Sequence, residues 1–550
     1  MVTGRQLATQ ALPSFGAREP AARLNAGENS QLVLIRRFGL FGSLLLAVGS
    51  LGAGAAPVFN PVASLPLIGL FARMPIVAIA CAFIGMAMIV LAWLWLGRLC
   101  RPRRIRLASV RELKRILLVW ALPLAFVPPL FSRDVYSYLA QSKIAALGLN
   151  PYVLGPARAL GNSDLLTQNV PNVWRDTPAP YGPLFITLGR GITAIAGDHV
   201  VLSILLQRVL ELLGLALIVW ALPRLAARWG VQPVSALWLG ALNPLVLFHL
   251  VAGVHNEALM IGLMLAGLEI ALRHVPIVGA PDHPPPLTRH EVGHLLLGAA
   301  VISLGAAVKI SALPALGFFG VFLARRLGNS WRVLGLVAVA LTAVAALVLT
   351  VFSIGTGLGF GWISALGTNG LVRSLYSPTT LLAYLVTGVG LVAGLGNHVD
   401  SAVAIVRVIC GASSVVLSVK LLLECRKGRF TPMVGLGLCL AVVVLLGATV
   451  QPWYLLWAAI PLAAGVGHSA FRTVAAGLSA VGALLIPPTG SAFDGRSFVL
   501  PQAYLGTAIV LVLLLLLVRR RLPVFRIRVP AAESEPRDSE PAGPTPAHSA

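Results

Sequence analysis

The chain has 550 residues, of which 57% are hydrophobic and only 11% are charged, whereas soluble domains contain about 25% charged residues. This composition excludes a string of ordinary soluble domains and indicates a membrane protein with many spans. There are 42 Lys and Arg against 19 Asp and Glu, a formal charge of +23. Because the basic residues lie between apolar runs, we interpret them as cytoplasmic loops near anionic lipid and not as a nucleic-acid surface.

The polar first 37 residues precede the first apolar run, 38–59. We expect residues 1–37 to form a flexible cytoplasmic arm and the run to be an uncleaved anchor. A second span is expected at about 76–97. The segment RLCRPRRIRLASVRELKR follows, and its density of Arg and Lys predicts a cytoplasmic loop. A third span, 116–131, then runs outward and places residues 132–199 on the outer face.

The later spans follow from the same rule. They are expected at 200–222, 234–252, 257–272, 294–308, 312–324, 333–353, 402–424, 433–449, 453–467, 472–487 and 504–518. The short, Gly-rich segment 379–397 is not expected to cross fully. The predicted fold class is therefore an all-α polytopic bundle of about 12–14 transmembrane helices. Residues 38–520 form this domain, and 521–550 form a disordered cytoplasmic tail.

Five connections bring polar residues to the expected outer face. They supply Arg133, Asp134, Tyr136, Trp174, Arg175 and Asp176; His255, Asn256 and Glu257; Lys309; Trp362, Asn369, Arg373 and Tyr376; and Gln451, Trp453 and Tyr454. Charged residues at membrane ends are costly to place in lipid, so their cluster is a hypothesis for a functional site.

Asp134 begins a segment that predicts a helix, since Val135, Tyr138 and Leu139 follow the spacing i, i+3, i+4. Such a helix suits the membrane interface. The acid either stabilises the first turn through the helix dipole or acts as a base, and the residues alone leave both open. Arg133 beside it is expected to keep the acid ionised.

The triplet His255-Asn256-Glu257 is two ligands short of a typical metal site. We expect it to cap a helix and to hydrogen-bond a sugar or a phosphate. Lys309 lies between two apolar runs, where a lysine either extends to the interface or meets a phosphate.

The outer aromatic residues either form a membrane-interface belt or stack on carbohydrate. Arg208 and Glu211, one turn apart, are expected to pair. No disulfide or metal motif is expected from the five cysteines, which lie within or beside apolar runs: Cys81, Cys100, Cys410, Cys425 and Cys439.

Several long segments carry a family resemblance. They are SRDVYSYLAQ, GLNPY, WRDTPAPYGPLF, GVHNEALMIGLMLAG, GFGWISALGTNGLVRS and QPWYLLWAAIPLAA. Together they resemble the polyprenol-phosphomannose-dependent α-1,6-mannosyltransferases of mycobacteria and corynebacteria, and most closely the type that starts the mannan core of lipomannan. The resemblance covers roughly 38–520 and leaves out both tails and the linker 273–293.

This resemblance implies a membrane glycosyltransferase of the GT-C class, with Asp134 as the catalytic base. It implies a polyprenyl-phosphate mannose donor and a mannosylated glycolipid acceptor. The product would be α-1,6 linkages of the lipomannan and lipoarabinomannan core, made at the outer face of the plasma membrane. Many GT-C enzymes have two neighbouring acids in that loop. Here one acid stands beside Arg133, so we expect no cofactor or bound metal and leave metal dependence open.

Inversion at the mannosyl carbon requires one base, and the leaving phosphate requires a cation. Candidates for binding the donor phosphate or sugar are Arg133, Arg175, Asp176, His255, Asn256, Glu257, Lys309, Arg373, Gln451, Trp453 and Tyr454. Two alternatives stay open. One is a GT-C transferase with another donor, such as a glucosyl or arabinosyl polyprenyl phosphate. The other is a lipid-linked-sugar flippase, although the paired halves typical of transporters are not evident.

Overall fold

The computed structural model describes residues 22–101, 105–275, 286–371, 373–374, 376–489, 505, 507–509 and 512. The elements belong to one compact unit that ends at Thr507. Its two strands, β1 (Ala22–Arg23) and β2 (Arg106–Leu107), form a short parallel pair. The other described elements are helical, which confirms the all-α class.

Six described helices are long and apolar enough to cross a membrane. They are α1 (Ala26–Ala53), α3 (Pro75–Gly97), α10 (Val200–Arg228), α13 (Arg289–Val308), α15 (Trp331–Gly355) and α18 (Val399–Arg426). A seventh candidate is a pair bent by 108°, formed by the π-helix η1 (Val246–Ala252) and α12 (Glu257–Leu272). The chain is therefore a multi-pass membrane protein, while the larger expected count stays a prediction. The expected tail and most of the span 504–518 lie outside the described residues.

The shorter helices lie between these in the chain or follow the last of them. They are α2 (Leu70–Arg73), α4 (Val110–Leu124), α5 (Asp134–Ala146), α6 (Pro156–Leu160), α7 (Leu165–Asn169), α8 (Asn172–Arg175), α9 (Pro183–Ala196), α11 (Pro233–Gly240), α14 (Pro314–Arg326), α16 (Gly361–Ala365), α17 (Pro378–Val392), α19 (Pro432–Leu445), α20 (Leu455–Gly465) and α21 (Ser469–Leu485). Three 3₁₀ segments complete the description: η2 (Ile310–Ala312), η3 (Leu366–Leu371) and η4 (Pro452–Tyr454).

The first long helix begins earlier than the hydropathy pattern predicts. Asn25 caps α1 by accepting a hydrogen bond from the backbone of Glu28, and the Glu28 side chain returns one to the Asn25 backbone. This capping box satisfies two amide groups at the helix start. Residues 26–37, expected to belong to the flexible arm, are therefore helical. Residues 1–21 lie outside the described part of the chain.

Small residues let α12 pack closely between α10 and α13. A Cβ atom added at Gly262 would lie 2.3 Å from the carbonyl oxygen of Gly214 on α10. One added at Gly267 would lie 2.6 Å from the carbonyl oxygen of Gly298 on α13. Glycine at such contacts allows helix backbones in membranes to approach one another. The position of α12, which bears Glu257, is thus determined by its two neighbours.

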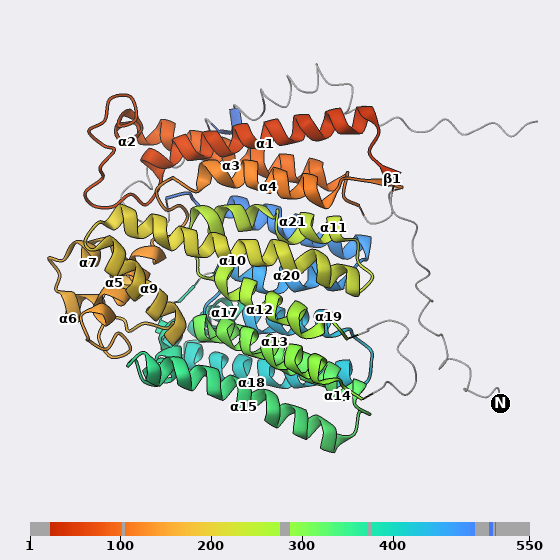
Figure 1. Cartoon of the computed structure of the whole chain (residues 1–550). Helices are drawn as coiled ribbons and strands as arrows, with labels where there is room; N and C mark the ends of the chain where they lie inside the picture. The colour runs from red at the N-terminus through yellow and green to blue at the C-terminus, as the bar shows by residue number, and fades with distance from the viewer. Residues whose placement is uncertain are drawn as a thin grey trace, which may run out of the picture. The chain divides into compact units, whose positions relative to one another are not determined.

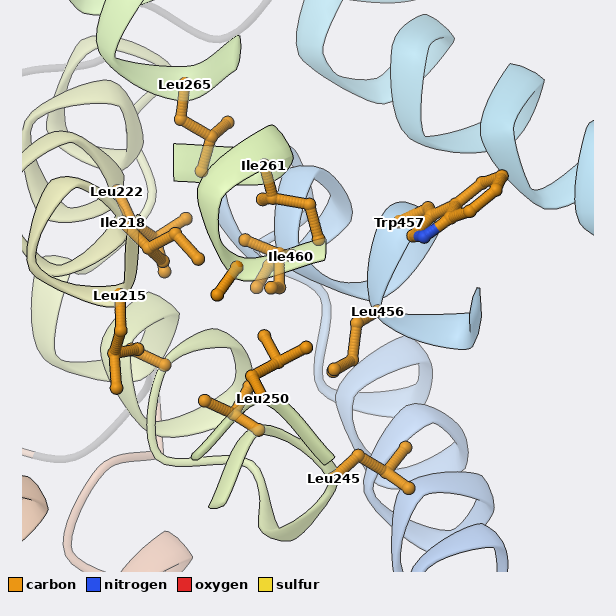
Figure 2. Packing of buried hydrophobic residues seen from close by; sticks show 14 of the residues in the cluster. Leu215, Ile218, Leu222, Leu245, Leu250, Ile261, Leu265, Leu456, Trp457 and Ile460 are labelled. Carbon is orange, nitrogen blue, oxygen red and sulfur yellow. The ribbon is translucent and has the colours of Figure 1, made fainter. Parts of the chain in front are cut away.

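A continuous apolar core joins α10, η1, α12 and α20 (Figure 2). Its members include Leu215, Ile218, Leu222, Leu245, Leu250, Ile261, Leu265, Leu456, Trp457 and Ile460. In a membrane, where lipid is as apolar as these side chains, such helices associate through the van der Waals contacts of close packing. The core therefore holds the broken helix η1–α12 firmly against its neighbours.

The expected outer loop is largely helical. Helices α5 to α9 gather at one end of the long helices (Figure 1), and α5 packs against α6, α7, α9 and α10. The helix predicted to begin at Asp134 is confirmed, and it ends at Ala146. Its residues from Val135 to Ser142 are all buried. Helix α5 is thus enclosed largely by protein, to which α9 and α10 contribute.

Candidate active site

A sharp break between η1 and α12 places three polar residues next to one another. Val254 adopts a φ of 58°, which is a rare, strained conformation for a β-branched residue. Such a backbone conformation costs about 1–3 kcal/mol of folding free energy, and it persists only where the surrounding packing imposes it. His255 and Asn256 follow directly, and Glu257 begins α12. All three side chains are buried.

A second strained residue lies beside the first. Phe131 has a φ of 67° and precedes Asp134 by three residues. Its N–H donates to the Pro488 carbonyl over 3.1 Å, while the N–H of Leu130 donates to the Ala252 carbonyl over 3.2 Å. The second bond joins the segment before α5 to the end of η1, at the break before α12, and the first joins it to the segment after α21. The two strained turns therefore meet in space, although more than a hundred residues separate them in the sequence.

His255 is the centre of the resulting cluster. Its Nδ1 lies 3.7 Å from Asp134 Oδ2, 3.5 Å from the Tyr138 hydroxyl and 4.0 Å from Glu257 Oε2. Its ring stacks on Trp453 with centroids 3.9 Å apart. Tyr138 is one helical turn beyond Asp134, on the same face of α5. The cluster thus joins α5, the start of α12 and η4.

Lys309 forms an ion pair with Glu257. The Lys309 Nζ donates to Glu257 Oε1 over 2.5 Å, and this nitrogen lies 4.7 Å from the Tyr454 ring centroid and 5.2 Å from that of Trp457. The two side chains of the pair are 11% and 1% exposed. A buried charge of this kind must be compensated, and the carboxylate and the two aromatic faces do so.

Four polar atoms of the triplet have no hydrogen-bond partner among the described residues. They are Nε2 of His255, both amide atoms of Asn256, and Oε2 of Glu257. Leaving a buried polar group unsatisfied costs about 1–3 kcal/mol. Asn256 stands at the cap position of α12, but its side chain makes no capping bond, contrary to expectation. This region therefore has the donors and acceptors of a site for a polar ligand.

The Asp134 carboxyl is the exposed edge of the cluster, with its side chain 25% exposed. Burial, and then the nearby charge of Glu257, raises the pKa of Asp134 to about 6, although Lys309 and the Ser132 hydroxyl act in the opposite direction. At neutral pH the group is thus ionised, and it accepts a proton more readily than an ordinary aspartate.

Arg133 does not act as the sequence predicts. Its guanidinium donates to the Ala56 carbonyl over 3.2 Å and lies over the Tyr136 ring, 5.9 Å from the centroid. The expectation that Arg133 keeps the acid ionised is therefore wrong. The cation that favours the ionised form of Asp134 is Lys309.

The expected Arg208–Glu211 pair is also wrong. Arg208 instead donates to the carbonyls of Ala125, Val251 and Ala252, at 3.0, 3.1 and 3.3 Å. Glu211 accepts from Gln207 Nε2 at 2.9 Å and from the Leu259 N–H at 3.2 Å. The break frees carbonyls at the end of η1 and amides at the start of α12. Helix α10 thus braces both sides of the break.

Three other predicted residues lie apart from the His255 contacts, two of them with partners elsewhere. Arg175 donates to the carbonyls of Val170 and Gln168, each over 3.0 Å, and so braces the turn between α7 and α8. Asp176 is exposed directly after α8. Arg373 pairs with Asp400 at the start of α18.

The remaining outer residues are divided between the cluster and the surrounding protein. Gln451 is half-buried before η4 and adjoins the cluster through the chain. The Tyr136 hydroxyl donates to the Ala55 carbonyl, and Trp362 is buried with its Nε1 bonded to Ser353 Oγ. Trp174 packs on the core, and Tyr376 is exposed. The Asn369 side chain lies outside the described part.

Three aromatic residues near the site were not among the predicted site residues. Tyr138 was assigned to an apolar stripe, although its spacing from Asp134 places it on the same helix face. Tyr181, in the Pro-rich TPAPYGP segment, meets Tyr138 edge-on at 5.0 Å. Trp457 lies one turn after Tyr454 and stacks on it at 4.5 Å. Helical spacing could have identified the first and the third of these.

Two family models match the regions that form this cluster. The model of the α-(1→6)-mannopyranosyltransferase N-terminal domain matches residues 36–325, and the model of the MptB C-terminal domain matches residues 379–516. This chain belongs to the α-(1→6)-mannopyranosyltransferase family. The first region holds the cluster from Asp134 to Lys309, and the second contributes Trp453 and Tyr454. As a member of this family, the protein is a glycosyltransferase.

Individual relatives extend over nearly the whole chain. A probable α-(1→6)-mannopyranosyltransferase of Mycolicibacterium smegmatis is 43% identical over 95% of this chain and 94% of its own length. A Mycobacterium tuberculosis α-(1→6)-mannopyranosyltransferase is 43% identical over 96% of this chain and 94% of its own length. The α-(1→6)-mannopyranosyltransferase B of Corynebacterium glutamicum is 33% identical over 89% of this chain and 83% of its own length. No solved structure matches the chain.

Proposed function

We propose that this family member transfers mannose, with inversion, from polyprenyl-phosphate mannose to a mannosylated glycolipid at the outer face of the plasma membrane. The product is an α-1,6 linkage of the lipomannan and lipoarabinomannan core. The observation that supports this most strongly is the Asp134 carboxylate at the open edge of the buried cluster formed by His255, Glu257 and Lys309. A single base beside a cation matches the needs of an inverting transfer from a sugar phosphate.

The proposed step begins at the acceptor hydroxyl. Asp134 takes the proton as the hydroxyl oxygen attacks the anomeric carbon of mannose. The bond from that carbon to the phosphate oxygen breaks, and its electron pair leaves with the phosphate. A phosphate leaving group needs little protonation, so the step requires one base and no partner acid. A carboxylate whose pKa is about 6 is well suited to accept this proton near neutral pH.

Lys309 stabilises the leaving phosphate in this proposal. An ammonium group has three N–H donors, and the pair with Glu257 uses one of them. The remaining donors provide a point charge for the phosphate as its negative charge grows. Glu257 positions the ammonium group, and the aromatic faces of Tyr454 and Trp457 limit its movement.

Asn256 and His255 hold the mannose. Their partnerless atoms include an amide donor, an amide acceptor and a ring nitrogen, which match the hydroxyl groups of a sugar. The stacked pair of His255 and Trp453 keeps the imidazole in one orientation. Both substrates are lipids, which explains why a site at the end of membrane-spanning helices is needed.

A transfer assay tests the proposal. Membranes containing the protein are supplied with radiolabelled polyprenyl-phosphate mannose and either a phosphatidylinositol mannoside or a mannosyl-glucuronosyl diacylglycerol. The expected product is a glycolipid whose label an α-1,6-specific mannosidase releases. Polyprenyl phosphates carrying glucose or arabinose serve as competing donors. Transfer of one of these sugars, with no transfer of mannose, would contradict the proposed donor.

A further inference from the structure

Three histidines converge where the C-terminal end of α12 meets the N-terminal end of α13, away from Glu257 and Lys309. His274 lies two residues after α12, and His290 and His294 lie one turn apart on one face of α13. Their ring centroids are 4.4 to 4.7 Å apart, and one ligand nitrogen from each lies within 4.8 Å of the others. Within the described ranges, no other group of three or more His, Cys, Asp or Glu side chains is this compact.

Local structure orients these rings. Thr288 caps α13 and forms a capping box with Glu291, so the first turn that bears His290 is well defined. The Nδ1 of His294 lies 3.0 Å from the His290 carbonyl oxygen. Because a carbonyl only accepts, Nδ1 is the donor of this bond, which leaves Nε2 as the nitrogen of His294 that can bind a metal ion. Metal-binding histidines are oriented in the same way by a bond at their second nitrogen.

The positive charges closest to the three histidines have partners of their own. Arg273, directly before His274, lies over the Trp220 ring, 5.7 Å from its centroid. Two other arginines nearby are already compensated, since Arg228 pairs with Glu269 at 3.2 Å and Arg326 with Glu291 at 3.3 Å. With both carboxylates engaged by arginines, the three imidazole rings are the ligands that this cluster offers to a metal ion.

We propose that His274, His290 and His294 bind one divalent transition-metal ion of the Zn²⁺ class. Imidazole nitrogen suits Zn²⁺, Co²⁺, Ni²⁺ and Cu²⁺, whereas Mg²⁺ and Ca²⁺ require oxygen ligands. Nitrogens bound at about 2.0–2.1 Å from a tetrahedral ion are roughly 3.3 Å apart, so small ring rotations complete the site. Water occupies the fourth position.

The ion would tie α12 to α13 at the end opposite the Glu257–Lys309 pair. Helix α12 has 16 residues, which corresponds to about 24 Å at 1.5 Å per residue. The same two helices are thus joined by an ion pair at one end and by a metal at the other. This metal site is separate from the proposed transfer chemistry. Its test therefore does not depend on the proposed function.

Cobalt binding to the purified full-length chain in detergent tests the proposal. The affinity tag is removed first, because polyhistidine binds the same ions. We expect one Co²⁺ per chain, a visible d–d absorption band, and displacement of Co²⁺ by Zn²⁺. The double variant His290→Gln/His294→Gln should lose about tenfold or more in Co²⁺ affinity, since even outer-shell changes cost about that much. The matched control is His398→Gln, which changes an exposed histidine just before α18.

Thermal unfolding provides a second measurement, because an ion that binds only the folded state raises its stability. Zn²⁺ should raise the unfolding temperature of the wild type and of His398→Gln, and leave that of the double variant unchanged. Equal Co²⁺ affinity in the wild type and the double variant would overturn the proposal. So would a wild type that binds no Co²⁺, or a Zn²⁺ effect that persists in the double variant.

Discussion

The cluster around His255 and the peripheral residues Arg175 and Arg373 were predicted by the same reasoning, yet they differ in how their polar atoms are satisfied. The peripheral arginines bond to nearby carbonyls or to an exposed acid. In the cluster, short side chains at a strained break leave buried atoms without partners. Long, flexible side chains find local partners easily, whereas short buried ones depend on their surroundings. The buried atoms without partners are therefore the reason that we place the proposed ligand site at the cluster and not at the peripheral arginines.

Replacing the proposed base should have the largest effect on activity. Asp134→Asn keeps the shape of the side chain but cannot accept the proton, so mannosyl transfer should fall about 10²–10⁴-fold or more. The matched control is Asp176→Asn, which changes an exposed acid of the same connection and should stay within about twofold of wild type. Both are measured by the radiolabelled transfer assay at equal protein levels. Equal losses in the two variants would remove the distinction between cluster and periphery.

Breaking the buried pair should have the largest effect on stability. Lys309→Met leaves Glu257 buried and uncompensated, which costs about 3–5 kcal/mol of folding free energy. The control Lys143→Met removes the partner of Asp164 and Asp198 from a more exposed pair, worth about 0–1 kcal/mol. Thermal unfolding in detergent compares the two. The double variant Glu257→Gln/Lys309→Met should recover stability but not activity, and recovery of activity would contradict a role for Lys309 at the phosphate.

The pH dependence separates Asp134 from ordinary surface acids. As the proposed base, Asp134 must be deprotonated to work, and its pKa is raised to about 6. The value of kcat/KM should therefore fall about tenfold per unit as the pH drops below about 6. In Glu257→Gln this acid limb should move to lower pH, because the charge of Glu257 raises the pKa of Asp134. A limb that stays in place would show that another group titrates.

The smallest effect is expected at the periphery. Arg373→Ala removes an exposed ion pair with Asp400, in which the two side chains are 43% and 81% exposed. Such pairs contribute about 0–1 kcal/mol, so both stability and transfer should stay near wild type. Parallel transfer and unfolding measurements check this. A tenfold loss of transfer would place Arg373 at the donor phosphate after all.

Several parts of the site could be predicted from residues near one another in the chain. An acid directly after an apolar run predicted the start of α5, and the GVHNEALM segment predicted a polar turn between apolar segments. The same local reasoning failed for Arg133 and Arg208. Both arginines have acids as sequence neighbours, but both donate to carbonyls of distant segments, at Ala56 and at the break near Val251. Sequence spacing cannot show that a broken helix leaves carbonyls that require donors.

By itself, the sequence determined the membrane class, the helical composition, the family resemblance and the single acid that begins α5. These properties depend on composition and on periodicity over a few turns, which the chain expresses locally. Only the tertiary structure decided that Asp134 meets His255, that Lys309 pairs with Glu257, and that His274 meets His290 and His294. The reason is physical: close packing of α12 against α10 and α13 through facing glycines sets which distant side chains share a buried space. No periodicity along the chain encodes that contact.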